Sequence, residues 1–144
     1  MKSQTISENQ MIEYYLYNLK NENKQEIIAF REVKNNQKRI DIVQFPVRKR
    51  GLGIAHAIEF KVFNWRAGFK QALGNRVLMP YNSIAIWEDY EYKINKEELL
   101  NEGIGLVIVS KDKNKVKIKP SKSQYLMRAI YQNIRKNIQI NLRN

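Results

Sequence analysis

The hydrophobic positions in the first half of the chain change from a helical to an extended spacing after about residue 20. Apolar residues recur every three or four positions behind the capping-box pair Ser7 and Gln10, which predicts a helix over residues 8–20. Three segments rich in Ile, Val and Phe follow, separated by turn-forming residues. They predict a three-stranded meander over residues 27–34, 38–45 and 54–63.

The second half repeats both spacings in shorter segments. Asn64 is a suitable N-cap for a second helix that runs to about Leu73, with Gly74 at its end. A strand, a short helix, a strand and an edge strand are then predicted over residues 83–87, 95–103, 106–110 and 116–119. We therefore expect one α/β domain over residues 1–144, with a central mixed β-sheet flanked by helices and extra strands and a helix at the C-terminus.

A four-residue repeat of apolar side chains marks that terminal helix. Leu126, Ile130, Ile134 and Ile138 form one stripe, whereas basic residues occupy the other faces. The stripe is suited either to packing on the core, which we favour, or to the interface of a homodimer.

Composition limits the chemistry that the chain can perform. The sequence has no cysteine, which excludes disulfides, thiolate zinc sites and cysteine nucleophiles. It has neither the apolar run of a signal peptide at its start nor a segment of eighteen apolar residues that could span a membrane. We therefore expect a cytoplasmic protein without a membrane-spanning part.

The charge balance indicates a polyanionic partner. The 26 Lys and Arg residues against 14 Asp and Glu residues give a formal net charge of +12. An excess of this size favours nucleic acid, with DNA as the first candidate. The alternative is a lysine-rich surface that binds nothing, which charge alone does not exclude.

One charged pair, Glu59 and Lys61, lies inside an otherwise apolar predicted strand. Glu-x-Lys occurs at four places in the chain, so the tripeptide by itself indicates little. If the second and third strands pair around Arg50, paired residue numbers sum to about 100, and Asp41 faces Glu59. Cross-strand partners have Cβ atoms about 4.5 to 5.5 Å apart, so two carboxylates would repel one another there unless a cation lay between them.

The first two strands extend this polar row. If these two strands pair across their turn so that paired residue numbers sum to about 73, Glu32 lies opposite Asp41 and Lys34 lies opposite Arg39. Since side chains alternate between the two faces of a strand, we expect one face of the meander to carry these charges and the other to form the core.

Two carboxylates completed by water and a substrate phosphate are suited to Mg²⁺ or Mn²⁺. Zinc is disfavoured because His56 is the only histidine, and strand parity places it on the core face as a structural residue. Lys61 could orient an attacking water or stabilise charge on a phosphate. The residues therefore predict metal-assisted hydrolysis of phosphodiester bonds, with a surface salt bridge between Glu59 and Lys61 as the non-functional alternative.

The same residues resemble the PD-(D/E)XK nuclease superfamily, which has a restriction-endonuclease-like αβββαβ core. The similarity is carried by residues 39–43, 57–61, 69–72 and 83–86 and covers a core over about residues 8–88. It implies that Asp41 and Glu59 bind the metal, that the Phe60 carbonyl is a further ligand, and that Lys61 is the catalytic lysine.

The resemblance also implies two accessory residues. An additional acid would be Glu32, in preference to Glu26, and the helix glutamine of some members would be Gln71. It further implies a DNA endonuclease that is selective for structure, such as one acting on junctions or on repair and recombination intermediates. A Holliday junction resolvase is one compact example.

Several basic residues are candidates for binding DNA around this site. We expect the contacts from three groups: Arg39 beside the acids, the distant turn with Arg48, Lys49 and Arg50, and the second helix with Arg66 and Lys70. The alternative from a different class is a catalytically inactive nucleic-acid-binding module with the same fold.

Overall fold

The computed structural model describes residues 6–22, 25–35 and 38–143. Its helices are α1 (Glu8–Glu22), α2 (Trp65–Asn75), the 3-10 helix η1 (Glu88–Lys93), α3 (Lys96–Asn101) and α4 (Arg128–Arg143). Its strands are β1 (Ile27–Asn35), β2 (Lys38–Arg48), β3 (Gly51–Leu52), β4 (His56–Lys61), β5 (Tyr81–Trp87), β6 (Gly105–Val109) and β7 (Asn114–Ile118).

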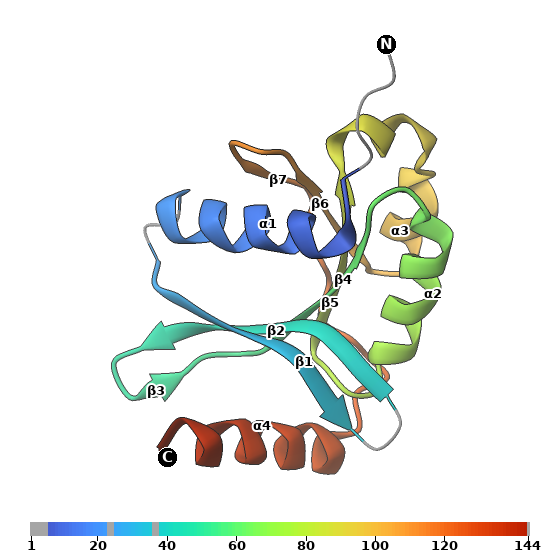
Figure 1. Ribbon diagram of the computed structural model, residues 1–144. Helices are drawn as coiled ribbons and strands as arrows, with labels where there is room; N and C mark the ends of the chain where they lie inside the picture. The colour runs from blue at the N-terminus through green and yellow to red at the C-terminus, as the bar shows by residue number, and fades with distance from the viewer. Residues whose placement is uncertain (1–5, 23–24, 36–37, 144) are drawn as a thin grey trace.

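The described strands form one mixed seven-stranded sheet in the order β1-β2-β4-β5-β6-β7, with the short β3 paired to β2 (Figure 1). The pairs β4–β5 and β5–β6 are parallel, and the others are antiparallel. The predicted α/β architecture, a mixed sheet flanked by helices, is therefore confirmed. Because β4 and β5 are parallel, their carboxyl ends lie at the same edge of the sheet, which is where ligands bind in open α/β sheets.

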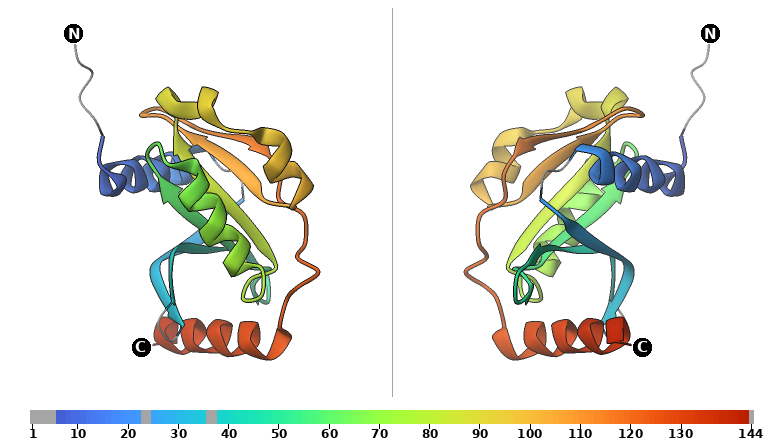
Figure 2. Two further views of the ribbon diagram at one scale, coloured as in Figure 1. Left: turned by 90° about the vertical axis from the view of Figure 1, so that its right-hand side faces the viewer. Right: turned by 90° about the vertical axis from the view of Figure 1, so that its left-hand side faces the viewer.

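Helices cover both faces of the sheet (Figures 1 and 2). On one face, α1 packs Met11, Ile12 and Tyr15 against apolar side chains of β2, β4, β5 and β6. On the other face, α2 packs against β5 and β6, and α4 packs against β2 and β4. Each face therefore has its own apolar cluster, and no face of the central strands is left to solvent.

The predicted N-terminal helix caps are confirmed, including Asn95 before α3, whose Oδ1 atom accepts from Glu98 N at 3.3 Å. The Ser7 Oγ atom accepts a hydrogen bond from the Gln10 N–H group at 3.1 Å, and Gln10 Oε1 accepts one from the Ser7 N–H group at 2.9 Å. Asn64 Oδ1 likewise accepts a bond from Ala67 N at 3.2 Å. The prediction that Gly74 ends the second helix is wrong, because α2 continues through it to Asn75.

The apolar stripe of the terminal helix packs on the core. Ile134 and Ile138 are 3% and 7% exposed and lie in the cluster around Phe45, and Ile130 packs against it. Packing on the core, the favoured interpretation, is confirmed, although Leu126 precedes α4 rather than lying on it. None of the helices in the described ranges is long and apolar enough to cross a membrane.

Candidate active site

The strand register brings Asp41 and Glu59 together. Ile42 pairs with Ile58 and Gln44 with His56, so the sum of 100 predicted for β2 and β4 is confirmed. From Ile42 toward Asp41, the backbone pairing between β2 and β4 stops. Hydrogen bonds from backbone N–H groups to carboxylates take its place. Phe60 N donates to Asp41 Oδ2 at 2.8 Å, and Asp41 N donates to Glu59 Oε1 at 3.4 Å. Each carboxylate is thus held by the backbone of the other strand.

Glu59 is buried, so the face of the meander predicted to carry the charges is itself covered at this position. Its side chain lies under α2 on a strand with both faces covered, and the residue is 2% exposed. Glu59 Oε2 and Asn75 Nδ2 are both buried without a hydrogen-bond partner. The Asn75 amide nevertheless lies near enough to lower the pKa of Glu59. The Asn75 amide of α2 therefore compensates in part for the burial of this carboxyl group.

The electrostatics of Glu59 follow from this position. Burial and, second to it, the neighbouring charge of Asp41 raise its pKa from the usual 4.5 to about 7. The N–H group of Asp41, the Asn75 amide and the charge of Lys61 act in the opposite direction. The carboxyl group is therefore partly protonated near neutral pH in the absence of a cation.

Asp41 is half-buried, and its pKa is raised like that of Glu59. Burial raises the pKa of Asp41, whereas the Phe60 N–H group and the charges of Lys61 and Arg39 lower it. The charge of Glu32 raises it. Two adjacent carboxyl groups with raised pKa values are a common feature of functional sites.

Lys61 completes the group from the end of β4. A Cβ atom at position 68 would lie 3.1 Å from Lys61 Cγ, so Gly68 allows α2 to pack closely over this side chain. The charge of Lys61 lowers the pKa of Asp41, Glu59 and Glu8. Within the described ranges, Lys61 and Glu59 form no ion pair at salt-bridge distance, and Glu59 is buried. The surface salt bridge considered from the sequence is therefore not present.

An open groove of about 640 Å³ is lined by Asp41 and Lys61, whereas Glu59 is buried beneath its lining. Its lining combines α1, the β1–β2 hairpin, β4 and α2, and consists of Glu8, Lys34, Lys38, Arg39, Asp41, Lys61 and Gln71. Gln71, predicted from the sequence, is therefore in the groove. Three cations from one hairpin thus border an acidic floor, an arrangement that can hold a polyanion with one phosphate over the carboxylates.

Glu8 and Lys38 are groove residues that the sequence did not identify. Burial raises the pKa of Glu8, the charge of Lys61 lowers it, and the charge of Asp41 raises it, which places Glu8 beside both. In the sequence, an acid in the first turn of a helix is explained by the helix dipole. Only the packing of α1 across the sheet reveals the proximity. The ammonium group of Lys38 lies over Gly74, where no side chain obstructs it.

Glu32 lies at the edge of the site. The register of β1 and β2 follows the predicted sum of 73, but Glu32 has a positive φ of 54° and lies in a gap of the ladder. Its exposed carboxylate forms an ion pair with Arg39 at 3.7 Å. Glu26 is farther away, since its carbonyl accepts from Val47 N near the opposite end of β2. Of the two predicted accessory acids, only Glu32 is close enough to affect Asp41.

The predicted basic residues divide into near and distant groups. Arg39 lines the groove. Arg48, Lys49 and Arg50 are exposed at the turn between β2 and β3, and Arg48 lies about 23 Å along the strand from Asp41 at the usual rise.

The basic residues predicted on α2 do not line the groove. Arg66 stacks on Trp65 at 4.5 Å and forms an ion pair with Glu98 of α3 at 3.4 Å, so it extends away from the groove. Lys70 is exposed on the same helix outside the groove lining.

The donor set fits a hard divalent cation better than zinc. In the described ranges, no three Asp, Glu, His or Cys side chains are arranged to hold a metal by themselves. Mg²⁺ requires only one or two carboxylates and takes its other ligands from water and phosphate. The Phe60 N–H group points to Asp41, and its carbonyl lies on the same side of the extended strand. Asp41, Glu59 and this carbonyl therefore suit Mg²⁺ or Mn²⁺.

His56 lies apart from these ligands. Its Nε2 atom is 2.7 Å from Ser83 Oγ, and it shares the parity of Ile58 and Phe60 on the face that α1 covers. Burial lowers the pKa of His56 to about 4, so the imidazole is neutral near pH 7. A structural role, as predicted, agrees with these contacts.

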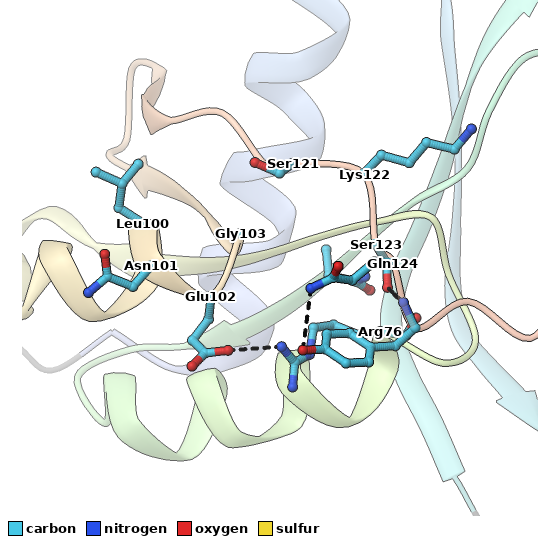
Figure 3. Close-up of a pocket in the computed structure, with 11 residues that line it drawn as sticks. Arg76, Leu100, Asn101, Glu102, Gly103, Ser121, Lys122, Ser123 and Gln124 are labelled. Carbon is cyan, nitrogen blue, oxygen red and sulfur yellow. Dashed lines mark hydrogen bonds and ion pairs between the residues drawn. The ribbon is translucent and has the colours of Figure 1, made fainter.

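A second concave region lies at the other end of α2 (Figure 3). It has a volume of about 270 Å³ and is bordered by Arg76, the turn around Gly103 and the segment 121–125. Arg76 forms an ion pair with Glu102 at 3.0 Å and stacks on Tyr125 at 4.4 Å. Because its guanidinium group is already neutralised and this region has no carboxylate pair like Asp41 and Glu59, we take the groove as the candidate site.

Comparison with known proteins provides support for the fold alone. No protein-family model matches the chain, and no curated protein matches it in sequence. A solved structure of a protein of unknown function from Silicibacter pomeroyi superposes with a TM-score of 0.67 at 15% sequence identity. The match covers 96% of this chain and 88% of that one. The two proteins therefore share an architecture, and the function has to be inferred from the site.

Proposed function

We propose that this protein is a metal-dependent nuclease that hydrolyses phosphodiester bonds in DNA. The observation that supports this proposal most directly is the facing pair Asp41 and Glu59 beside Lys61. Two adjacent carboxylates are stabilised by a bound cation, and a neighbouring ammonium group is suited to the charge of a phosphate.

Each residue has a distinct role in this proposal. Asp41, Glu59 and the Phe60 carbonyl would hold Mg²⁺ or Mn²⁺, and Glu8 lines the same groove beside Asp41. When bound, such an ion polarises the phosphate and lowers the pKa of a water molecule. Lys61 stabilises negative charge on the phosphate or orients the attacking water. Gln71 lies in the same groove and can donate to a phosphate oxygen.

The cations of the β1–β2 hairpin would bind the flanking phosphates. Lys34, Lys38 and Arg39 line the groove from one side, and the predicted turn around Lys49 would contact the nucleic acid farther away. A substrate that extends along β2 could touch both regions. The separation of these two regions along β2 is consistent with a junction or another branched repair or recombination intermediate as the substrate.

The Lys38→Ala variant should bind duplex DNA more weakly and with a smaller dependence on salt. Each lost phosphate contact should reduce the slope of log affinity against log salt concentration by about 0.9. Fluorescence anisotropy between about 50 and 200 mM salt, without divalent metal, measures this slope. The exposed Lys20→Ala variant at the end of α1 is the control and should keep the wild-type slope. An unchanged slope in Lys38→Ala would remove this side chain from the interface.

The second candidate function is that of an inactive nucleic-acid-binding module with the same fold. One observation favours it: the hydrogen bonds between Asp41, Glu59 and the facing backbone already hold the ends of β2 and β4 together. Carboxylates with this structural role would be retained without catalysis.

A cleavage panel distinguishes the two functions. The full chain would be incubated with duplex, flap, junction and single-stranded DNA and with RNA, in Mg²⁺, in Mn²⁺ and in EDTA. The nuclease proposal expects cleavage of at least one substrate that stops in EDTA. If the protein binds these substrates and cuts none of them, the binding module is correct. If it binds none, neither function holds.

A further inference from the structure

An exposed aromatic cluster lies at the carboxyl end of β4, outside the groove residues. We call Phe63, Tyr90, Tyr92 and Lys93 the aromatic platform. The Phe63 and Tyr90 rings are 5.8 Å apart, and Lys93 Nζ lies 5.6 Å from the Tyr90 ring and 5.9 Å from the Tyr92 ring. Phe63 is 53% exposed and Tyr92 is 78% exposed. Phe63 packs on Tyr90, which is anchored on the core cluster of α2, whereas Tyr92 is linked to Tyr90 through Lys93.

The aromatic platform is next to the candidate active site. Phe63 follows Lys61 by two residues, so their Cα atoms are at most about 7 Å apart. η1 begins directly after β5, and Trp87 N donates to Val62 O at 3.2 Å, which fixes the turn before α2 against the end of β5. Figure 1 shows this turn and η1 together at the edge of the sheet near the start of α1.

The charges of η1, around the aromatic platform, are better suited to a nucleobase than to a phosphate. η1 carries Glu88 and Asp89, both exposed, which would repel the sugar-phosphate backbone. Glu91 is neutralised by Lys96 at 2.9 Å and by Lys117 at 3.4 Å. The hairpin cations border the groove that Lys61 lines, two residues before Phe63. A strand that crosses the carboxylates would therefore have its phosphates on the hairpin and a base over the rings.

We propose that the aromatic platform stacks an unpaired nucleobase next to the phosphate held in the groove, so that the preferred substrate has a single-stranded segment there. This inference rests on the nuclease proposal and adds the substrate class to it. Every base has a planar face, and stacking on an exposed aromatic ring is tolerant of sequence. A paired base inside a duplex presents only its edge, so the contact would select for unpaired nucleotides.

Binding of fluorescent oligonucleotides tests the platform. The wild-type chain, Phe63→Ala, Tyr92→Ala, Phe63→Tyr and the control Tyr17→Ala would be titrated with one labelled strand, alone and as a duplex, in EDTA. Tyr17 is 67% exposed on α1 and matches Tyr92 in residue type and exposure. We expect Phe63→Ala and Tyr92→Ala each to weaken single-strand binding about tenfold. Duplex binding should change little, and Phe63→Tyr and Tyr17→Ala should behave as the wild type.

The outcomes separate this inference from the proposed function. If the two alanine variants bind single strands as well as Tyr17→Ala does, while the wild type cuts DNA, the platform inference is wrong and the nuclease proposal stands. An equal loss on single strand and duplex also overturns it, because the rings would then contact the backbone. If the wild type binds neither form, the proposed function itself fails.

Discussion

Replacing Asp41 by Asn or Lys61 by Ala should lower metal-dependent cleavage of DNA about 100- to 1000-fold, the range found when one electrostatic group is removed from an active site. The Asp41→Asn variant would retain an oxygen for the Phe60 N–H group but lose the charge that a cation requires. The Lys61→Ala variant would lose the ammonium group at the end of β4. Both variants should still bind DNA with a strong dependence on salt, since neither change removes a hairpin cation. Initial cleavage rates and anisotropy titrations measure the two properties separately.

Matched substitutions on the surface provide the controls for these variants. Asp112→Asn, in the exposed turn before β7, and Lys20→Ala, at the end of α1, change the same charges away from the groove and should cut at the wild-type rate. Thermal unfolding of all four variants checks that each is folded. If Asp41→Asn and Lys61→Ala both cut as fast as their controls, the cleavage does not occur at this site.

The strand register was predictable because two turns and the alternation of side chains determine it. Asn35 pairs with Lys38 across the first turn, and the sums of 73 and 100 follow along the strands. A shift of one residue would have moved every apolar side chain of β4 to the other face. Local information was therefore enough to place Asp41 opposite Glu59 and to place Lys61 beside them.

The burial of Glu59 and the position of Glu8 were not predictable in the same way. Both depend on how helices pack on the sheet, and those contacts join residues far apart in the sequence. Gly68 lets α2 lie close over β4, and this covers Glu59. α1 crosses the opposite face and brings Glu8 to the groove. A sequence pattern gives the apolar face of each helix, but it does not give the partner or the direction of packing.

In the absence of divalent metal, Glu59 should make a contribution to the free energy of unfolding that falls as the pH rises from about 4.5 to about 7, opposite in sign to the contribution of His56, whose pKa is lowered to about 4. The pKa of Glu59 is raised to about 7 in the folded protein, so between these values the folded state binds more protons than the unfolded state. A shift from 4.5 to about 7 corresponds to about 3 kcal/mol, and this stability is present below pH 4.5 and lost above pH 7. Urea unfolding in EDTA over this pH series measures the change.

Glu59→Gln isolates the contribution of this carboxyl group, because its amide is neutral at every pH in the series. Between about pH 4.5 and 7 the stability of the wild type relative to Glu59→Gln should fall by about 3 kcal/mol, whereas its stability relative to Glu97→Gln, in the exposed first turn of α3, should stay constant. A cation that binds Asp41 and Glu59 stabilises only the folded state and favours the ionised carboxylates. Mg²⁺ or Mn²⁺ at pH 8 should therefore restore stability to the wild type and have little effect on Glu59→Gln. If the metal stabilises both proteins equally, it binds elsewhere, and Glu59 is a structural residue.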